Sequence, residues 1–298
     1  MKRTLLCVPN VSEGRDRATV EAIAAAIRGT EGVGLVEHSS DPDHNRSVFA
    51  YLGEPEAVLA ATRSLTTEAF RRIDMSTHSG RHPRLGAVDV VPFVPLRSVS
   101  REEALEICRR FGRWVGDQGV PVYYYEEAAT RPERRSLPEV RRGGYEGLAE
   151  RLVRPEGAPD EGPAEPNLRT GALVTGIRGP LVALNVNLRT EDLSTARAIA
   201  RSVREAGGGF EGVRALGIPL NERGMVQVSM NLTRPEQTSV ARLFEAIREE
   251  AARRGVQVAG TEFVGPVPAA ILVEIVRHCL GAEGLKEAQV VELALLEE

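Results

Sequence analysis

The first half of the chain alternates short apolar runs with segments that repeat apolar residues at helical spacing. Apolar β-branched runs predict strands, whereas apolar residues that recur every third or fourth position predict amphipathic helices. We therefore expect strands at residues 4–12, 33–40, 46–53 and 87–96, and helices at residues 16–28 and 54–73. These elements follow one another in the order β-α-β-β-α-β.

The second half repeats this order. Strands are expected at residues 181–188, 212–220, 224–233 and 256–265, and helices at residues 191–206 and 238–255. The order is that of the ferredoxin-like fold. We predict an α+β protein with two duplicated ferredoxin-like subdomains, residues 1–178 and 179–298, each with a largely antiparallel sheet and helices packed on one face. An additional helix at residues 100–119 and a strand at residues 120–126 extend the first half.

Composition narrows the classes of function. The chain has 298 residues, of which 42% are hydrophobic and 27% charged, as in an ordinary globular protein of two domains. No apolar run approaches the roughly 18 residues of a membrane helix. The start, "MKRTLLCVPN", lacks the apolar core of an export signal, so we expect a cytoplasmic protein. With a net charge of −4 and 4% aromatic residues, neither nucleic acid nor a membrane is an expected partner. The three cysteines form no CxxC motif, so reduced, buried thiols are expected.

Two histidines stand four residues apart in "DMSTHSGRHPRLGAVDVVPF", just before a predicted strand. On a helix, His78 and His82 would share a face and could bind a metal ion. However, Ser79 and Gly80 are poor helix residues, and a residue before proline favours an extended backbone, so we expect a loop and no metal site. His82 is then either a structural histidine or a general base that titrates near neutral pH.

The connection at residues 38–49, "HSSDPDHNRSVF", is the other concentration of polar residues. It is either a plain turn, since Asp, Pro and Asn favour turns, or a binding site. As a site it would offer the carboxylate of Asp41 to a cation and the guanidinium of Arg46 to a carboxylate. The Pro- and Gly-rich residues 154–171 are likewise either a linker or a loop that touches a ligand. No GxGxxG motif follows a predicted strand, and no GxxxxGK[ST] phosphate-binding motif or GxSxG nucleophile motif is present.

Several long motifs resemble those of one known family, the glutamate formimidoyltransferases, which are folate-dependent enzymes of histidine breakdown. The resemblance runs from residue 7 to about residue 268 and covers the transferase part alone, without the cyclodeaminase domain of animal relatives. The motifs are "CVPNVSEGRD", "HNRSVF", "IDMSTHSGRHPRLGAVDVVPF", "PVYYYEEAA", "GALVTGIRGPLVALNVNL" and "QVSMNLT".

The resemblance implies two ferredoxin-like subdomains with folate between them, a homodimer, and tetrahydrofolate as co-substrate without a metal. It implies transfer of a formimidoyl group from N-formimidoyl-L-glutamate to N5 of tetrahydrofolate, and it places the catalytic histidine at His82. The implied folate-binding residues are Gly162, Pro163, Ala164, Glu165, Pro166, Asn167, Leu168, Arg169, Thr170 and Gly171.

The chemistry of that reaction suggests roles for the remaining candidates. His82 would accept a proton from N5 and pass it to the departing glutamate nitrogen. Asp41 would face the positively charged amidine, while Arg46 and Arg84 would bind carboxylates, with Asn45 as a further substrate contact. Two other functions stay open: formyl transfer on the same scaffold, and folate binding without turnover.

Overall fold

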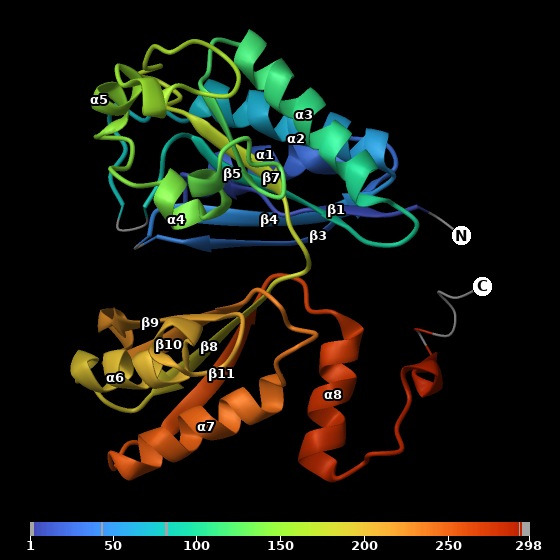
Figure 1. Cartoon of the computed structure of the whole chain (residues 1–298), viewed down its shortest axis with the longest axis vertical. Helices are drawn as coiled ribbons and strands as arrows, with labels where there is room; N and C mark the ends of the chain where they lie inside the picture. Colours follow the sequence, from blue (N-terminus) through green and yellow to red (C-terminus); the bar gives the residue numbers. More distant parts are fainter. Residues whose placement is uncertain (1–2, 43, 81–82, 292, 294–298) are drawn as a thin grey trace. The chain divides into compact units, whose positions relative to one another are not determined.

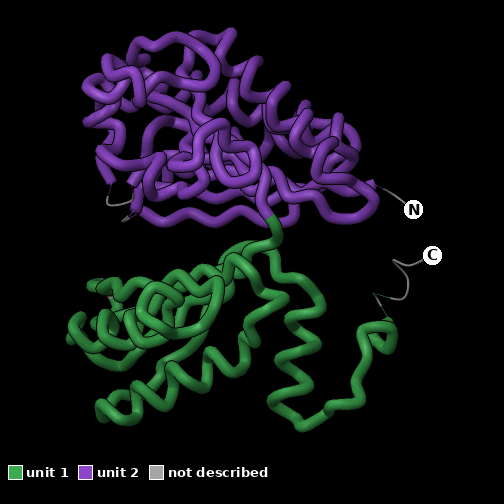
Figure 2. The backbone as a smooth tube through the Cα atoms, viewed as in Figure 1, with its two compact units in different colours: residues 1, 179–298 green, residues 2–178 purple. Residues whose placement is uncertain are grey.

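The computed structural model describes residues 3–42, 44–80, 83–291 and 293. The described part of the chain divides into two compact units, one that ends at residue 178 and one that begins at residue 179 (Figure 2). Both units combine sheets with helices, so the protein belongs to the α+β class, as predicted (Figure 1).

The described part of the first unit contains one mixed sheet of seven strands. These are β1 (Leu5–Cys7), β2 (Asn10–Val11), β3 (Val33–Asp41), β4 (Arg46–Gly53), β5 (Val88–Pro95), β6 (Val122–Glu126) and β7 (Leu173–Ile177). Both β1 and β2 lie between β4 and β5, so the single strand predicted at residues 4–12 is broken in two. The break contains Pro9, which has no N–H to donate to a neighbouring strand.

The first unit buries its main core between this sheet and three long helices. They are α1 (Arg17–Arg28), α2 (Pro55–Arg72) and α3 (Arg101–Asp117). In α1, Val20, Ile23, Ala24 and Ile27 are buried at the spacing of one helical face. The Asp16 side chain caps the start of α1 by accepting a hydrogen bond from the backbone of residue 18.

The opposite face of the sheet is also covered at one end, which differs from the prediction of helices on one face only. The short helices α4 (Leu137–Val140) and α5 (Leu148–Leu152) bury a second core there. This core consists of Leu85, Val90, Tyr123, Tyr125, Val140, Leu148, Leu152, Ala172 and Val174. The sheet is parallel where β7 pairs with β5 and β6, and parallel strands are normally buried on both faces.

In the second unit, four described strands form an antiparallel sheet in the order β11-β8-β10-β9. The strands are β8 (Val182–Leu188), β9 (Val213–Leu220), β10 (Met225–Leu232) and β11 (Val258–Val264), and the long helices are α6 (Leu193–Val203), α7 (Val240–Arg253) and α8 (Ala269–Leu280). Alternate residues of the central strands pack against α6 and α7 in one apolar core.

The sequence pattern located most of these elements but missed β7 and α8. β7 is five residues long, contains Gly176, and is held by pairing with two strands distant in sequence, so no local period reveals it. Short 3-10 helices complete the described part, at Pro132–Arg135, Pro155–Gly157, Glu205–Gly207, Asn221–Arg223 and Glu287–Gln289.

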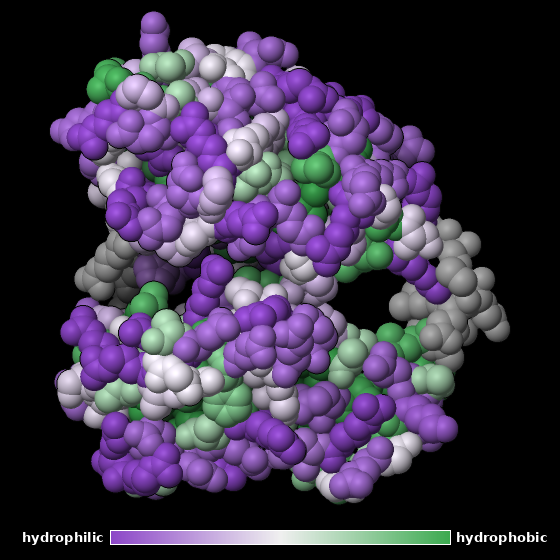
Figure 3. Space-filling view, in the orientation of Figure 1, coloured by the Kyte–Doolittle hydropathy of each residue, from purple (hydrophilic) through white to green (hydrophobic). Residues whose placement is uncertain are grey.

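The surface of each unit carries mostly hydrophilic residues with smaller apolar patches on the face drawn in Figure 3. Among the helices of the described residues, none has the length and apolar character needed to cross a membrane.

Candidate active site

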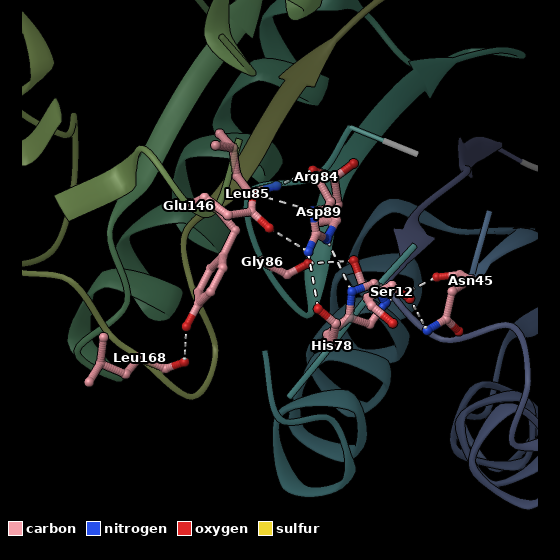
Figure 4. Close-up of polar contacts among 11 residues, drawn as sticks. Ser12, Asn45, His78, Arg84, Leu85, Gly86, Asp89, Glu146 and Leu168 are labelled. Carbon is pink, nitrogen blue, oxygen red and sulfur yellow. Dashed lines mark hydrogen bonds and ion pairs between the residues drawn. The ribbon is translucent and has the colours of Figure 1, made fainter. Parts of the chain in front are cut away.

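Asn45 joins three segments of the chain at the turn between β3 and β4. Its backbone has a positive φ of 49°, a conformation that Asn tolerates better than most residues. Oδ1 accepts a hydrogen bond of 2.9 Å from the backbone N–H of Gly14, and Nδ2 donates one of 2.9 Å to the carbonyl of Ser79. Asn45 is only 7% exposed. The turn is thereby fixed against the loop after β2 and the loop before β5 (Figure 4).

His78 lies in the loop before β5, with both ring nitrogens in hydrogen bonds. Nδ1 is 3.0 Å from Arg84 Nε, and Nε2 is 3.2 Å from the carbonyl oxygen of Asn45. Arginine only donates and a carbonyl only accepts, so the ring is neutral and carries its proton on Nε2. Burial lowers the pKa of His78 below its ordinary value; the hydrogen bond to Asn45 opposes this shift and the charge of Arg84 adds to it. His78 is therefore an anchor of the loop.

Arg84 is held between His78 and Glu146 (Figure 4). Its Nη2 donates to Glu146 Oε1 at 2.8 Å and to the carbonyl of His78 at 3.2 Å, and Nη1 donates to Glu146 Oε2 at 3.4 Å. Burial works to raise the pKa of Glu146, but its own backbone N–H and Arg84 outweigh burial and the pKa is lowered. Since Arg84 is only 9% exposed, this network favours a positioning role over the predicted carboxylate binding.

The predicted catalytic residue, His82, lies outside the described residues. The chain on either side of it is tied to the rest of the unit. Gly80 packs on His44 so closely that an added Cβ would lie 2.5 Å from the His44 carbonyl oxygen. On the other side, the backbone N–H of Leu85 donates a hydrogen bond of 2.9 Å to the carboxylate of Asp89.

Asp41 and Arg46 face each other across the turn, since they form the last pair in the register of β3 and β4. Asp41 accepts a hydrogen bond of 2.8 Å from the backbone of His44, whose Nδ1 lies 3.0 Å from the other carboxylate oxygen. Arg46 Nε is buried without a hydrogen-bond partner among the described residues. Burial lowers the pKa of Arg46 and the charge of Arg141 adds to this, while the charges of Asp41 and Asp89 oppose it.

Arg141, at the end of α4, is a charged neighbour that the sequence pattern did not single out. It forms an ion pair with Asp89, which is 2% exposed and lies on β5. The sequence does signal that Asp89 needs a charged partner, because this aspartate lies inside the apolar run "AVDVVPF" and a buried carboxylate is normally paired. The distant position of that partner in the sequence could not be read from the pattern.

A pocket of about 610 Å³ opens between the start of α1 and the end of β3. Its lining includes Gly14, Arg15, Arg17, His38, Ser40 and Pro42. Arg15 Nε donates a hydrogen bond of 2.8 Å to the carbonyl of Pro42, next to Asp41. Space for a small molecule therefore adjoins the turn that carries Asp41 and Asn45.

The predicted folate loop, residues 162–171, is anchored at both ends by glycines with positive φ. Gly162 has a φ of 80°, and an added Cβ would lie 2.4 Å from the carbonyl oxygen of Val120. Gly171 has a φ of 70°, and an added Cβ would lie 2.2 Å from the carbonyl oxygen of Leu85. Residues 163–166, between these anchors, are exposed.

The last residues of this loop contact the segment that leads to β5. The backbone N–H of Ala87 donates to the carbonyl of Thr170 at 2.8 Å, and that of Met75 donates to the carbonyl of Arg169 at 2.8 Å. Asn167 Oδ1 accepts hydrogen bonds from the backbone N–H groups of Arg169 and Thr170. The carbonyl of Leu168, whose side chain is exposed, accepts a hydrogen bond of 2.6 Å from a tyrosine hydroxyl, that of residue 145 (Figure 4). The structure thus brings the end of the loop to the site, whereas the Gly162 end lies beside Val120 and α3.

In the part of the chain that the structure describes, no three His, Cys, Asp or Glu side chains are grouped so that they could hold a metal ion. The groups that converge are instead one neutral imidazole, three arginines and three carboxylates. They are His78, Arg46, Arg84, Arg141, Asp41, Asp89 and Glu146. Such a set suits a small polar substrate that carries charges of both signs.

Two family models together match almost the whole chain. Residues 4–178 match the family described as "Formiminotransferase domain, N-terminal subdomain", and residues 183–297 match "Formiminotransferase domain". A "Glutamate formimidoyltransferase" of Streptococcus pyogenes serotype M1 is 40% identical over 284 residues, which is 95% of each chain.

Two further relatives differ in length from each other. A protein of the same name from Thermoplasma acidophilum is 39% identical over 96% of this chain and 95% of its own. The "Formimidoyltransferase-cyclodeaminase" of Mus musculus is 40% identical over 92% of this chain but only 52% of its own length. The chain therefore belongs to the formiminotransferase domain family.

Proposed function

We propose that this protein is a glutamate formimidoyltransferase. It moves the formimidoyl group of N-formimidoyl-L-glutamate to N5 of tetrahydrofolate, which gives 5-formimidoyltetrahydrofolate and L-glutamate. The observation that carries the proposal is the 40% identity to the Streptococcus protein of that name over 95% of both chains. Tetrahydrofolate is a co-substrate, and the site described above requires no metal for this reaction.

In the proposed mechanism, His82 moves the proton. The N5 amine attacks the formimidoyl carbon and loses a proton as the tetrahedral intermediate forms. His82 accepts that proton as a general base and then gives it to the glutamate nitrogen as the carbon–nitrogen bond breaks. The anchoring of Gly80 and Leu85 supports this role, because a general base acts only when the chain around it is held in place.

The charged residues have distinct proposed roles. Asp41 faces the amidine, which is positive when protonated, and Arg46 faces a carboxylate. Arg84 and Asn45 hold the loops, since most of their donors and acceptors already bind protein groups. This arrangement favours Arg46 over Arg84 as the carboxylate ligand.

We further propose that residues 162–171 contact the folate. Two features support this: the loop is fixed beside the segment before β5, and the hydroxyl of Thr170 is buried without a hydrogen-bond partner among the described residues. A buried hydroxyl without a partner is costly, and a ligand group could satisfy it.

One assay distinguishes this function from formyl transfer and from folate binding without turnover. Purified protein is incubated with tetrahydrofolate and either N-formimidoyl-L-glutamate or N-formyl-L-glutamate, and the folate product is followed by absorbance. We expect turnover of the formimidoyl donor; turnover of the formyl donor alone would favour formyl transfer. The His82→Ala variant should lose turnover and keep its affinity for tetrahydrofolate, whereas a protein that only binds folate would show no turnover in either form.

We propose that both units follow the ferredoxin-like pattern with a boundary after residue 178; the strand order β11-β8-β10-β9 and the placement of β1 and β2 between β4 and β5 support it. A homodimer and a cytoplasmic location are further proposals, and the family resemblance supports the first. Sedimentation of the purified protein tests the first, and fractionation of cells tests the second.

A further inference from the structure

Arg46 is a partly buried cation without a hydrogen-bond or ion-pair partner among the described residues, and its surroundings indicate which group it binds. No hydrogen bond or ion pair from another described residue reaches its guanidinium, and its Nε is buried. We propose that Arg46 and Arg141 together form the subsite for the α-carboxylate of the amino-acid donor. This inference rests on the proposed function and adds the residues that select the donor.

The strand register places both arginines on one face of the sheet. Val48 pairs with Asn10, and Asn10 pairs with Val90, so these three side chains point to the same side. Val90 belongs to the small core that also contains the α4 residue preceding Arg141. Arg46 lies two residues before Val48 on β4, so its side chain projects to that same face.

The two arginines are close enough to act together. Arg46 lies on β4, whereas Arg141 follows α4 and is bound to Asp89 on β5. β4 and β5 flank β2, so their backbones are separated by roughly 10 Å, a distance that the Arg46 side chain and the Asp89–Arg141 pair can bridge toward a common ligand. Asp89 on β5 binds Arg141 through both carboxylate oxygens, and one of these oxygens also accepts the hydrogen bond from Leu85. Asp89 therefore holds Arg141 by direct hydrogen bonds, whereas Asp41 and Asp89 act on Arg46 only through their charge.

The charge pattern next to Arg46 matches the donor. Asp41 is its register partner on β3, and side chains of directly paired residues lie about 5 Å apart. In N-formimidoyl-L-glutamate the amidine nitrogen and the α-carboxylate are attached to the same carbon, so the substrate presents a positive and a negative group side by side. When the α-carboxylate of the donor binds Arg46, the amidine of the same molecule lies toward Asp41.

Arg84 is a poorer candidate for this subsite. Its guanidinium already binds the carboxylate of Glu146 and two atoms of His78. A substrate carboxylate would have to displace Glu146, whereas at Arg46 it would supply a missing partner.

The test compares Arg46→Gln with the parent and with Arg109→Gln, which removes an exposed arginine of α3. Loss of a charge-assisted hydrogen bond to the substrate should raise KM for formimidoylglutamate about 10- to 100-fold and leave KM for tetrahydrofolate unchanged. Affinity for the product L-glutamate, measured by calorimetry, should fall by a similar factor. Arg109→Gln should match the parent in both measurements.

Thermal unfolding without ligand provides an independent readout. A buried charge without a partner destabilises a protein, so the melting temperature of Arg46→Gln should equal or exceed that of the parent. If Arg46 had a purely structural role, its substitution would instead lower the melting temperature of the protein. Arg141→Lys, which keeps a charge beside Asp89 but loses the planar fork, should also weaken L-glutamate binding.

The outcomes distinguish this inference from the proposed function. If the parent transfers formimidoyl groups and Arg46→Gln keeps its KM for the donor within twofold, the subsite is wrong and the function stands. If the parent shows no turnover, the function fails, and the L-glutamate titrations of parent and Arg46→Gln alone decide whether Arg46 binds the carboxylate.

Discussion

Arg84 Nε donates a hydrogen bond of 3.0 Å to His78 Nδ1, and this contact determines which nitrogen of the imidazole carries the proton. With Nδ1 as acceptor, Nε2 must donate to the carbonyl of Asn45, 3.2 Å away. Protonation of His78 would turn Nδ1 into a donor that faces another donor. The pair thus couples the protonation state of one residue to the position of the loop before β5.

The first prediction concerns pH. The folded-state pKa of His78 is lowered by burial, and among the charged groups around it Arg84 and Arg15 favour the neutral form while Glu13 opposes them. The unfolded chain therefore binds more protons, and the stability that His78 contributes is present above pH of about 6.5 and is lost as the pH falls through the lower folded-state pKa. Between about pH 7.5 and about pH 5, the urea midpoint of the parent should fall more steeply with decreasing pH than the urea midpoint of His78→Gln. Equal slopes would contradict the prediction.

The second prediction concerns Asn45. Asn45→Ala removes the hydrogen bonds to Gly14 and Ser79 and places a less tolerant residue at positive φ, so it should reduce the free energy of unfolding by about 2–4 kcal/mol. Asn45→Gly loses the same side-chain bonds but keeps the backbone conformation, and it should cost about 1 kcal/mol less. Urea denaturation of the three proteins measures both differences. Identical losses would mean that the backbone conformation contributes nothing.

The third prediction compares two glycines. A Cβ on Gly14 would lie 2.4 Å from the carbonyl oxygen of Asp41 and 2.6 Å from the backbone nitrogen of Arg46, whereas a Cβ on Gly34 in β3 would meet nothing within 4 Å. Gly14→Ala must therefore shift the turn, with a loss of about 1–3 kcal/mol and reduced transfer activity. Gly34→Ala should change stability by no more than about 0.5 kcal/mol and leave the activity unchanged. Thermal unfolding and the transfer assay on both variants test this, and full activity in Gly14→Ala would contradict it.

The fourth prediction concerns the thiols. Cys7 and Cys108 are buried as expected, and burial raises the pKa of each to about 12, but Cys279 is exposed, unlike the buried thiol that the sequence suggested. A thiol reagent at neutral pH should therefore modify one cysteine of the native protein quickly and all three after denaturation. Cys279→Ser should abolish the fast reaction. Fast modification of a second thiol in that variant would show that the core opens.

Much of the fold could be predicted because its elements have local signals. The helices at residues 16–28 and 54–73 and the strand pairs of both units were found from periods of 3.6 and 2, which depend only on neighbouring residues. The missed strand β7 depends on parallel pairing with β5 and β6, which no neighbouring residue encodes. Likewise, α4 and α5 are too short for a clear period, and their coverage of the second sheet face follows from packing.

The candidate site shows the same division. The sequence identified Asp41, Asn45, Arg46 and Arg84 as polar residues in loops between strands, and the structure brings their segments together. Their individual surroundings depended on residues far along the chain: Glu146 forms an ion pair with Arg84, and the charge of Arg141 contributes to the lowered pKa of Arg46. The role of His82 stays a prediction, because that residue lies outside the described ones.

The sequence by itself determined the α+β class, the order of most elements, and the family through its long motifs. Only the tertiary structure decided which charged groups are already paired and which remain available to a ligand. The reason is physical: secondary structure follows from the hydrophobic period of adjacent residues, whereas the partner of a buried charge is set by whichever distant segment packs against it.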